Sequence, residues 1–351
     1  MTVTTSAFSL STSSENRLVV TPLLRWFASV LLLSSSIGAH AVATASPAPE
    51  PAVIAPRAAE SLLTAITRAG ARRLVAVGSR GHILLSDDSG EHWRQVASPV
   101  SSLLTAVTFL DAQTGWAVGH DGIVLKTTDG GETWRMHRFD PTSVPLLDVM
   151  FLDAQRGFAL GAYGTFLTSE DGGETWQAVD NALTEEGKHL NAIARLADGR
   201  LLIVGELGLI GVSADEGRSW MLGALPYEGS LFAVQPYGAH GAIVGGLRGN
   251  SFWSLDVAAD GWTRIETGSL HSVFGIAEHG AGFILVGFNA SAIVVTADGD
   301  VRTLSLRPLS NGFVPARSIE ASAFSDVVVL DNGELITVGD AGVRRWAVEP
   351  D

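Results

Sequence analysis

The sequence predicts an all-β fold, a seven-bladed β-propeller built from four-stranded antiparallel sheets. One observation is an eight-residue pattern that occurs four times, with a hydroxyl residue, Asp two positions on, Gly four on and Trp seven on. The other is an apolar residue followed by Gly, which recurs at intervals of 40 to 52 residues. Intervals of this size are typical of propeller blades. The seven apolar residues are Val77, Val118, Leu160, Val204, Val244, Val286 and Val338.

The second repeat contains every strand expected of one blade. Leu104–Leu110 and Trp116–Gly119 have the composition of its first two strands. The next strand is expected at Ile123–Lys126, after a turn at His120-Asp121-Gly122. The fourth is expected at Trp134–Met136, directly after the eight-residue pattern. One repeat therefore predicts one antiparallel meander.

The eight-residue pattern has the chemistry of a tight β-hairpin turn. Its Asp can accept backbone N–H bonds as in an Asx-turn, its Gly allows positive φ, and its Trp buries a large ring. Four similar turns on separate repeats cannot converge on one site, and Asp-x-Gly offers fewer oxygens than Ca²⁺ prefers. We therefore interpret these residues as structural. They are Asp88, Gly90, Trp93, Asp129, Gly131, Trp134, Asp171, Gly173, Trp176, Asp215, Gly217 and Trp220.

The last three repeats depart from this pattern. In the fifth, Trp262 falls one residue late, and in the sixth Thr296–Asp300 has no Trp. In the seventh, Gly342–Val348 matches a third strand, and no sequence remains for a fourth. An unpaired strand edge is a liability. We therefore expect an N-terminal strand, Ala52–Ala55, to pair with Arg344–Val348 and close the ring.

Composition narrows the possible functions. The chain has 351 residues, 39 of them Gly, and a formal net charge of −14. No basic stripe is visible, which argues against nucleic-acid binding. The absence of Cys excludes disulfides and Cys-ligated metals. The repeats favour one large all-β domain over two average ones.

The N-terminus has the features of a secretory signal. Basic residues precede an apolar run at residues 26–38, and Ala41-Val42-Ala43 matches a small-residue cleavage site. The run is short for a membrane-spanning helix. We predict a signal peptide at 1–43, a Pro-rich leader at 44–51, the propeller at 52–351 and a periplasmic location. An uncleaved N-terminal anchor is the alternative.

Catalytic motifs are sparse. A sialidase would need an Arg cluster, a Tyr nucleophile and an acid/base Asp. The chain has three Tyr, Tyr163, Tyr227 and Tyr237, and no Arg-Ile-Pro motif before the first blade. Its nine His show no metal-binding spacing, and it has no G-x-S-x-G elbow. We predict no enzyme activity, cofactor or metal. A glycan-binding module, or a sialidase- or glycosidase-like enzyme of the cell envelope, remains the alternative.

The repeated turn resembles the Asp-box, or bacterial neuraminidase repeat, of sialidases and of non-enzymatic propellers. Over about residues 52–351 the layout is similar to the photosystem II stability and assembly factor family. The resemblance depends on the frames Val118-Gly119-x-x-Gly122 through Thr133-Trp134 and Leu160-Gly161-x-x-Gly164 through Thr175-Trp176. It implies a secreted or lumenal scaffold without catalytic residues that assists a membrane complex. Photosynthetic members have an Arg-rich binding surface, whereas this chain is acidic.

We expect the propeller to be a monomer that binds a protein partner. The partner is expected to be a membrane protein or the soluble tail of one, such as an envelope transporter in a non-photosynthetic bacterium. The face opposite the repeated turns should bind it, because its short turns differ from blade to blade, as expected of functional loops on a repeated scaffold. Linker cations such as Arg138, Lys188 and Arg307 should make this face locally basic; ordinary solvated turns are the alternative. The candidate residues are Arg80, His120, Tyr163, Glu206, Arg248, Asn289 and Arg317.

Overall fold

The computed structural model describes residues 48–223, 225–259, 261–309 and 322–348. Two units are distinguished, Met1–Ala45 and Ser46–Asp351, and everything below concerns the second. The predicted signal peptide at 1–43 and the candidate residue Arg317 lie outside the described residues. Within the described ranges, no helix combines the length and the apolar character needed to cross a bilayer.

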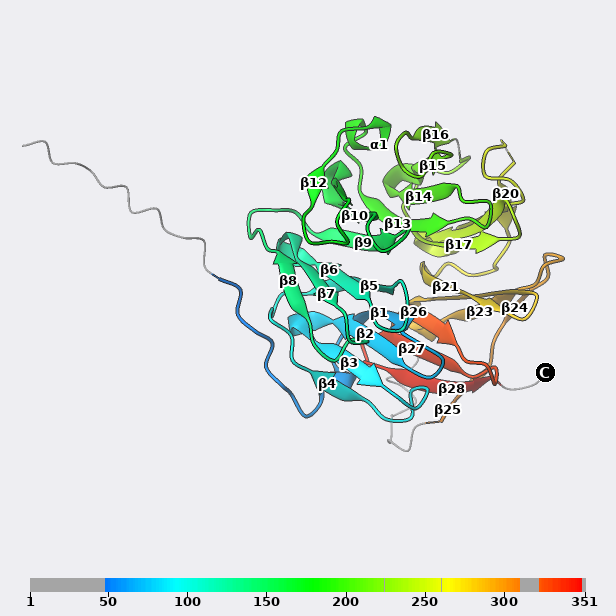
Figure 1. The fold of residues 1–351 in the computed structure, drawn as a ribbon. Helices are drawn as coiled ribbons and strands as arrows, with labels where there is room; N and C mark the ends of the chain where they lie inside the picture. The colour runs from blue at the N-terminus through cyan, green and yellow to red at the C-terminus, as the bar shows by residue number, and fades with distance from the viewer. Residues whose placement is uncertain (1–47, 224, 260, 310–321, 349–351) are drawn as a thin grey trace, which may run out of the picture. The chain divides into compact units, whose positions relative to one another are not determined.

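The described residues between 63 and 348 form seven four-stranded antiparallel sheets, which confirms the seven-bladed propeller (Figure 1). In blades 1 to 6 the strands follow chain order from the channel outward. Blades 1 to 3 contain β1 (Leu63–Arg68), β2 (Leu74–Gly78), β3 (Ile83–Ser86) and β4 (Arg94–Val96); β5 (Leu104–Phe109), β6 (Gly115–Gly119), β7 (Val124–Thr127) and β8 (Arg135–Arg138); β9 (Leu146–Phe151), β10 (Gly157–Gly161), β11 (Phe166–Ser169) and β12 (Gln177–Ala178).

The remaining blades repeat this arrangement, with blade 7 differing in its outermost strand. Blades 4 to 7 contain β13 (Leu190–Arg195), β14 (Leu201–Gly205), β15 (Ile210–Ser213) and β16 (Met221–Gly223); β17 (Leu231–Tyr237), β18 (Gly241–Gly246), β19 (Ser251–Ser254) and β20 (Thr263–Ile265); β21 (Val273–His279), β22 (Gly282–Gly287), β23 (Ala292–Val295) and β24 (Val301–Thr303); β25 (Leu306–Pro308), β26 (Phe324–Val329), β27 (Leu335–Gly339) and β28 (Arg344–Val348). Two short helices lie in the connections before β1 and between β12 and β13, η1 (Ala58–Glu60) and α1 (Ala182–Glu185), and six helical turns join second and third strands.

The predicted N-terminal closing strand is wrong. The outermost strand of blade 7 is β25, which pairs with β28 so that Leu306 lies opposite Val348. The chain therefore supplies this strand just before it enters the innermost strand, β26. The three residues Leu-Arg-Pro are too short to show an alternating pattern, so the repeat alignment did not reveal them. Pro308 is tolerated because it lies on an edge strand.

The N-terminal segment takes a different place. The backbone N–H of Ala52 donates to the Ser98 carbonyl at 3.0 Å, and that of Ala55 donates to Gln95 Oε1 at 2.8 Å, so this stretch follows the outer edge of blade 1. Farther on, Val343 N donates to the Ala59 carbonyl at 2.9 Å. The segment therefore covers the boundary of blades 7 and 1 by packing rather than by strand pairing.

The apolar core is divided into seven clusters, one at each boundary between neighbouring blades, which we call seams. At seam 1/2, for example, Leu85 of blade 1 packs with Leu104 and Leu125 of blade 2. At seam 7/1, Leu74 packs with Ile336. Because a blade buries both of its faces against its neighbours, the last seam closes the ring without exchanging a strand.

The first strands of the seven blades, β1, β5, β9, β13, β17, β21 and β26, lie side by side around a central channel. A cavity of about 540 Å³ lies between β1, β17, β21 and β26. Thr67, Gln235, Glu278 and Asp326 are among the residues that line it. The channel therefore presents polar side chains among apolar ones.

Candidate functional site

Four turns with the eight-residue pattern join the third and fourth strands of blades 1 to 4; we call them the box turns. In the second, Thr127 Oγ1 accepts from Gly131 N at 3.0 Å, and Asp129 Oδ1 accepts from Thr133 N at 2.9 Å. Trp134 Nε1 donates to the Gly131 carbonyl at 3.0 Å. The other three turns repeat these bonds within 0.2 Å. The box side chains thus hold one another.

The same bonds determine the ionisation of the box aspartates. Hydrogen bonds from Thr175 lower the pKa of Asp171 to about 2, and those from Ser219 lower the pKa of Asp215 to about 2. Burial alone would raise the pKa of Asp129, but hydrogen bonds from Thr133 and Thr127 keep it below its ordinary value. These carboxylates are ionised at neutral pH, so they are poor general acids.

Each box turn also contacts the blade before it. A Cβ added to Gly173 of blade 3 would lie 2.5 Å from Trp116 Nε1 of blade 2, and one added to Gly217 of blade 4 would lie 2.4 Å from Phe158 of blade 3. The Trp116 indole donates to the Gly172 carbonyl at 3.0 Å. The glycines are therefore required for close packing across a seam as well as for positive φ.

An ion pair accompanies each box turn at its seam. A basic residue of the preceding blade meets an acidic residue of the box turn in four successive seams, and seam 4/5 has a similar pair without a complete box. The pairs are Arg345–Glu91 at 3.2 Å, Arg73–Glu132 at 2.9 Å, Lys126–Glu174 at 2.8 Å, Arg156–Glu216 at 2.5 Å and Arg200–Asp256 at 2.9 Å.

The first box turn differs from the others because His92 replaces Thr or Ser. Ligand atoms of Asp88, Glu91 and His92 lie within 4.8 Å of one another, a grouping that the sequence spacing did not reveal. The protein already satisfies these atoms, however. His92 Nδ1 lies 2.7 Å from Asp88 Oδ2, and Glu91 pairs with Arg345. The three side chains are exposed or half-buried, so we assign no metal to them.

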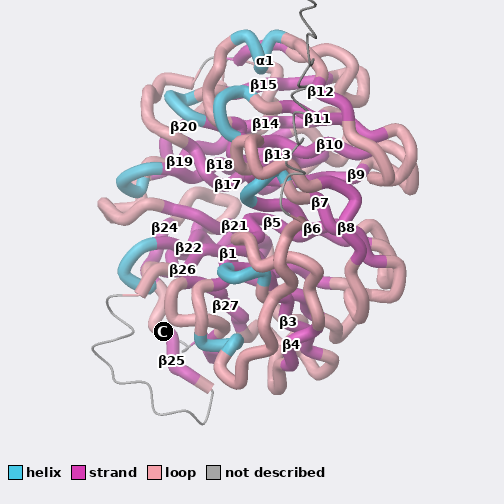
Figure 2. Tube along the Cα trace, turned by 90° about the vertical axis from the view of Figure 1, so that its left-hand side faces the viewer, coloured by secondary structure: helices cyan, strands magenta, loops and turns pink. Residues whose placement is uncertain are grey.

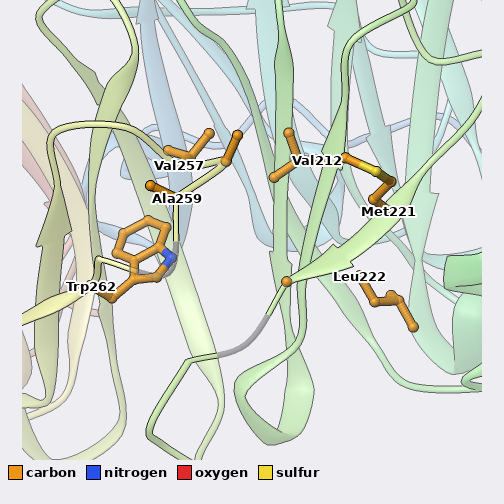
Figure 3. Close-up of a pocket in the computed structure, with 8 residues that line it drawn as sticks. Val212, Met221, Leu222, Val257, Ala259 and Trp262 are labelled. Carbon is orange, nitrogen blue, oxygen red and sulfur yellow. The ribbon is translucent and has the colours of Figure 1, made fainter.

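An apolar cleft of about 250 Å³ lies between blades 4 and 5. Figure 3 shows Val257, Ala259 and Trp262 on one side and Val212 and Met221 on the other. The cleft forms where the box turn is missing from blade 5. Val257 packs with buried residues of both blades at this seam. Its apolar lining offers no group for acid–base or nucleophilic chemistry.

The opposite end of each blade carries the turn between strands two and three, which we call the tip turn. Figure 2 shows such short helical turns in cyan around the side that faces the viewer. In blades 1 to 6 the middle residue of this turn has φ between 54° and 57°, which places its side chain at the tip. The turns in blades 1 to 6 are η2 (Ser79–Gly81), η3 (His120–Gly122), η4 (Ala162–Gly164), η5 (Glu206–Gly208), η6 (Leu247–Gly249) and η7 (Phe288–Ala290).

The tip turns contain all the described candidate residues, with a shift of one position in two of them. Arg80, Tyr163, Arg248 and Asn289 are the tip residues of their turns. His120 and Glu206 instead precede the tips, which are Asp121 and Leu207. Positive φ is uncommon for residues other than Gly, Asn and Asp, so nothing in the sequence marked Leu207 as a tip.

The predicted local basicity is reduced by pairs within the same face. Arg138 lies 3.6 Å from Asp140, and Lys188 lies 2.8 Å from Glu186. Arg80 and Arg248 are exposed, and neither has an ion-pair partner among the described residues. The positive charge available to a partner on this face is therefore concentrated at two tips.

Two carboxyl groups inside the channel were not anticipated. Asp148 of blade 3 accepts from Ile193 N of blade 4 at 2.9 Å, and Asp326 of blade 7 accepts from Ile66 N of blade 1 at 3.0 Å. Burial, with repulsion from Asp326, raises the pKa of Asp148 to about 7. Burial raises the pKa of Asp326 to about 6. Perturbed carboxyls mark catalytic sites in many enzymes, but here each joins two blades.

The family model described as photosynthesis system II assembly factor YCF48 matches residues 85–144 and 138–231. No curated protein matches the chain. The structure titled "YCF48 bound to D1 peptide" is similar at 16% identity and TM-score 0.64, covering 87% of this chain and 98% of that one.

Two further structures have the same fold. YCF48 from Cyanidioschyzon merolae matches at 16% identity and TM-score 0.64, covering 82% of this chain and 95% of that one. The WD40 β-propeller domain of Doa1 matches at 12% identity and TM-score 0.60, covering 83% and 94%. At such identities these similarities establish the propeller architecture.

Proposed function

We propose that this chain, a propeller of the photosystem II assembly factor-like family, is a non-catalytic scaffold that binds a protein partner through its tip turns and assists a membrane-associated complex. The observation that carries the proposal is the contrast between the two ends of the blades. Box side chains bond to one another, and the box turns pack against the preceding blade. At the tips, Tyr163 is 69% exposed and Leu207 56% exposed.

A protein ligand fits these exposed groups. Aromatic residues and Arg are enriched at the centres of protein interfaces, and both kinds occupy tips here. One of the similar structures is that of YCF48 bound to a D1 peptide. We infer that the partner of this chain is likewise a polypeptide, either a membrane protein or its soluble tail, and that the propeller works as a monomer.

The proposed location is the periplasm, reached through cleavage of the predicted signal peptide. Fractionation of cells that express the full chain provides the measurement, together with the N-terminal sequence of the recovered protein. The expected N-terminus lies near residue 44. Recovery of the uncleaved chain in the membrane pellet would instead support the N-terminal anchor.

Site-specific photo-crosslinking tests the binding face. A photoreactive amino acid placed at Tyr163 should yield a discrete adduct with a membrane-fraction protein when intact cells are irradiated. The matched control places the same amino acid at Arg218, an exposed residue of the fourth box turn. Equal adducts from both positions, or an adduct from Arg218 alone, would move the binding face to the other end of the blades.

The enzymatic alternative has its own test. The purified chain should not hydrolyse sialosides or other envelope glycosides above the rate measured with a heat-denatured sample. Turnover that survives purification would contradict the scaffold proposal, and loss of that turnover on substituting a channel or tip residue would locate the active site.

A further inference from the structure

In each blade the innermost strand begins at the end that carries the tip turn, because its first residues pair with the last residues of the second strand. The second residue of each innermost strand therefore lies at the mouth of the channel on this face. In three blades this residue bonds to the next blade. Thr64 Oγ1 donates to the Leu104 carbonyl at 2.6 Å, and Thr105 Oγ1 to the Leu146 carbonyl at 2.7 Å. Asn191 Nδ2 donates to the Leu231 carbonyl at 2.7 Å. The mouth is polar along these blades.

Blades 5 and 6 have a different chemistry at the same level. Phe232 and Phe274 take the equivalent positions, with ring centroids 5.3 Å apart, and Phe274 lies 4.9 Å from the ring of Phe288 in the tip turn of blade 6. Phe288 is 48% exposed, and Leu247, the first residue of the tip turn of blade 5, is 38% exposed. These four residues form what we call the aromatic corner.

A cation adjoins the aromatic corner. Arg248 follows Leu247 at the tip, and its backbone N–H donates to Ser272 Oγ at 3.2 Å, which places the turn against the start of β21. No carboxylate in the described part of the chain lies within ion-pair distance of Arg248. An apolar surface next to an uncompensated cation on an acidic protein is complementary to a ligand that is apolar and negatively charged.

We propose that the aromatic corner and Arg248 bind an extended peptide segment of the partner that presents an aromatic or large aliphatic side chain next to a carboxylate. The apolar side chain packs on Phe274 and Phe288, and the carboxylate pairs with the Arg248 guanidinium. This inference rests on the proposed function, because it identifies where on the tip face the polypeptide of the partner binds.

The probe for this site is a random dodecapeptide phage library selected on the immobilised chain. We expect the selected peptides to share an aromatic or large aliphatic residue within a few positions of Asp, Glu or the C-terminus. Their binding, measured by fluorescence polarisation, should weaken at least tenfold for Phe288→Ala and about fivefold for Arg248→Gln. Leu255→Ala is the matched control, since Leu255 is 76% exposed at the opposite end of its blade, and it should leave binding unchanged.

The outcomes separate this inference from the proposed function. Selected peptides that bind Phe288→Ala and Arg248→Gln as tightly as the wild type would overturn the aromatic corner, while crosslinks from Tyr163 would still support the scaffold. Failure to select any peptide would overturn the corner as well. Loss of binding through misfolding is recognised by melting temperature, because Phe288 and Arg248 are surface residues whose substitution should leave it within a few degrees.

Discussion

Blades 1 to 4 and blades 5 to 7 close their seams by different means. The four box turns each place a glycine and an ion pair on the preceding blade, so seams 7/1, 1/2, 2/3 and 3/4 are alike. Seam 5/6 instead uses rings, with Tyr237 5.5 Å from Phe283 and 6.0 Å from Trp253. Blade 7 buries Trp346, whose indole donates to Thr337 Oγ1 at 2.8 Å.

The difference shows which part of a repeat the fold requires. All seven seams bury an apolar cluster, whereas the box turn is present in only four blades. The box is thus one of several ways to seal a seam. Two of the three blades that lack it, blades 5 and 6, form the aromatic corner at the other end, so these two blades differ from blades 1 to 4 at both ends.

The largest effect is expected from Gly173→Ala. The new Cβ would lie 2.5 Å from Trp116 Nε1, and φ at this position is +86°, so both the seam and the turn would be strained. We expect a loss of 3 kcal/mol or more, about the cost of a severe core substitution. Thermal or urea unfolding provides the measurement.

The matched variant for that prediction is Gly299→Ala in blade 6. Its φ is +93°, but the nearest atom to an added Cβ is 3.6 Å away on Trp253. Only the backbone penalty of about 1–2 kcal/mol should apply. Equal losses in the two variants would show that the box glycine has no special role in the seam.

The second prediction compares the Asp of a box turn with the corresponding Asp of blade 6, where the eight-residue pattern is incomplete. In Asp129→Asn the turn loses a charged acceptor of the bonds from Thr133, and we expect a loss of about 1.5–3 kcal/mol. Asp298 in blade 6 is exposed and accepts a hydrogen bond from Thr296, so Asp298→Asn should leave stability almost unchanged. A stable Asp129→Asn variant that lost partner binding would refute the structural interpretation.

The repeated parts of the molecule could be predicted from the sequence, because they depend on local chemistry. Hydroxyl, Asp, Gly and Trp at fixed spacing determine a turn whose bonds are all internal. β25 could not be predicted, since a three-residue strand has no period of its own and its place depends on β28. The positive φ of Leu207 is likewise imposed by the surrounding blade rather than by its side chain.

The site was less predictable than the fold. Strand topology was enough to locate the tip face. The sequence pattern did not reveal, however, the residues on this face whose chemistry differs most from that of the equivalent residues in other blades. Phe232 and Phe274 stand where Thr64 and Thr105 stand in other blades, and an alignment of first strands would have shown this. Asp148 could have been noticed as one acidic residue inside an apolar strand. Its bond to the next blade, however, exists only in the closed ring.

The third prediction concerns two carboxyl groups on the innermost strands, one in blades 1 to 4 and one in blades 5 to 7, whose pKa values are both raised. Asp148 at seam 3/4 and Asp326 at seam 7/1 have pKa values raised to about 7 and about 6. When the pKa of a carboxyl group is higher in the folded than in the unfolded protein, its protonation stabilises the fold. This stabilisation is complete below the pKa of the unfolded state and is lost as pH rises through the pKa of the folded state. Stability should therefore fall by about 1–2 kcal/mol from pH 5 to pH 8. This is less than about 1.4 kcal/mol for each unit of pKa shift, because both residues are only half-buried and solvent screens their charges.

The double variant Asp148→Asn/Asp326→Asn isolates this contribution. Burial, with the charge of Arg80, lowers the pKa of His82, so this histidine makes stability rise with pH in the same range. Subtracting the profile of the double variant from that of the wild type removes the His82 contribution. The difference should decline between pH 5 and pH 8. A flat difference would mean that the channel carboxyls titrate normally.

The smallest effect is expected from the ion pairs that accompany the boxes. Glu132 forms ion pairs with Arg73 at 2.9 Å and with Arg94 at 2.6 Å, but all three side chains remain partly exposed. Exposed pairs contribute about 0–1 kcal/mol and weaken with salt. Glu132→Gln should therefore cost less than about 1 kcal/mol, and most of that cost should vanish in 1 M salt, whereas the loss in Gly173→Ala should persist there. A salt-independent loss above about 2 kcal/mol would show that charge, rather than close packing of the box glycine, seals these seams.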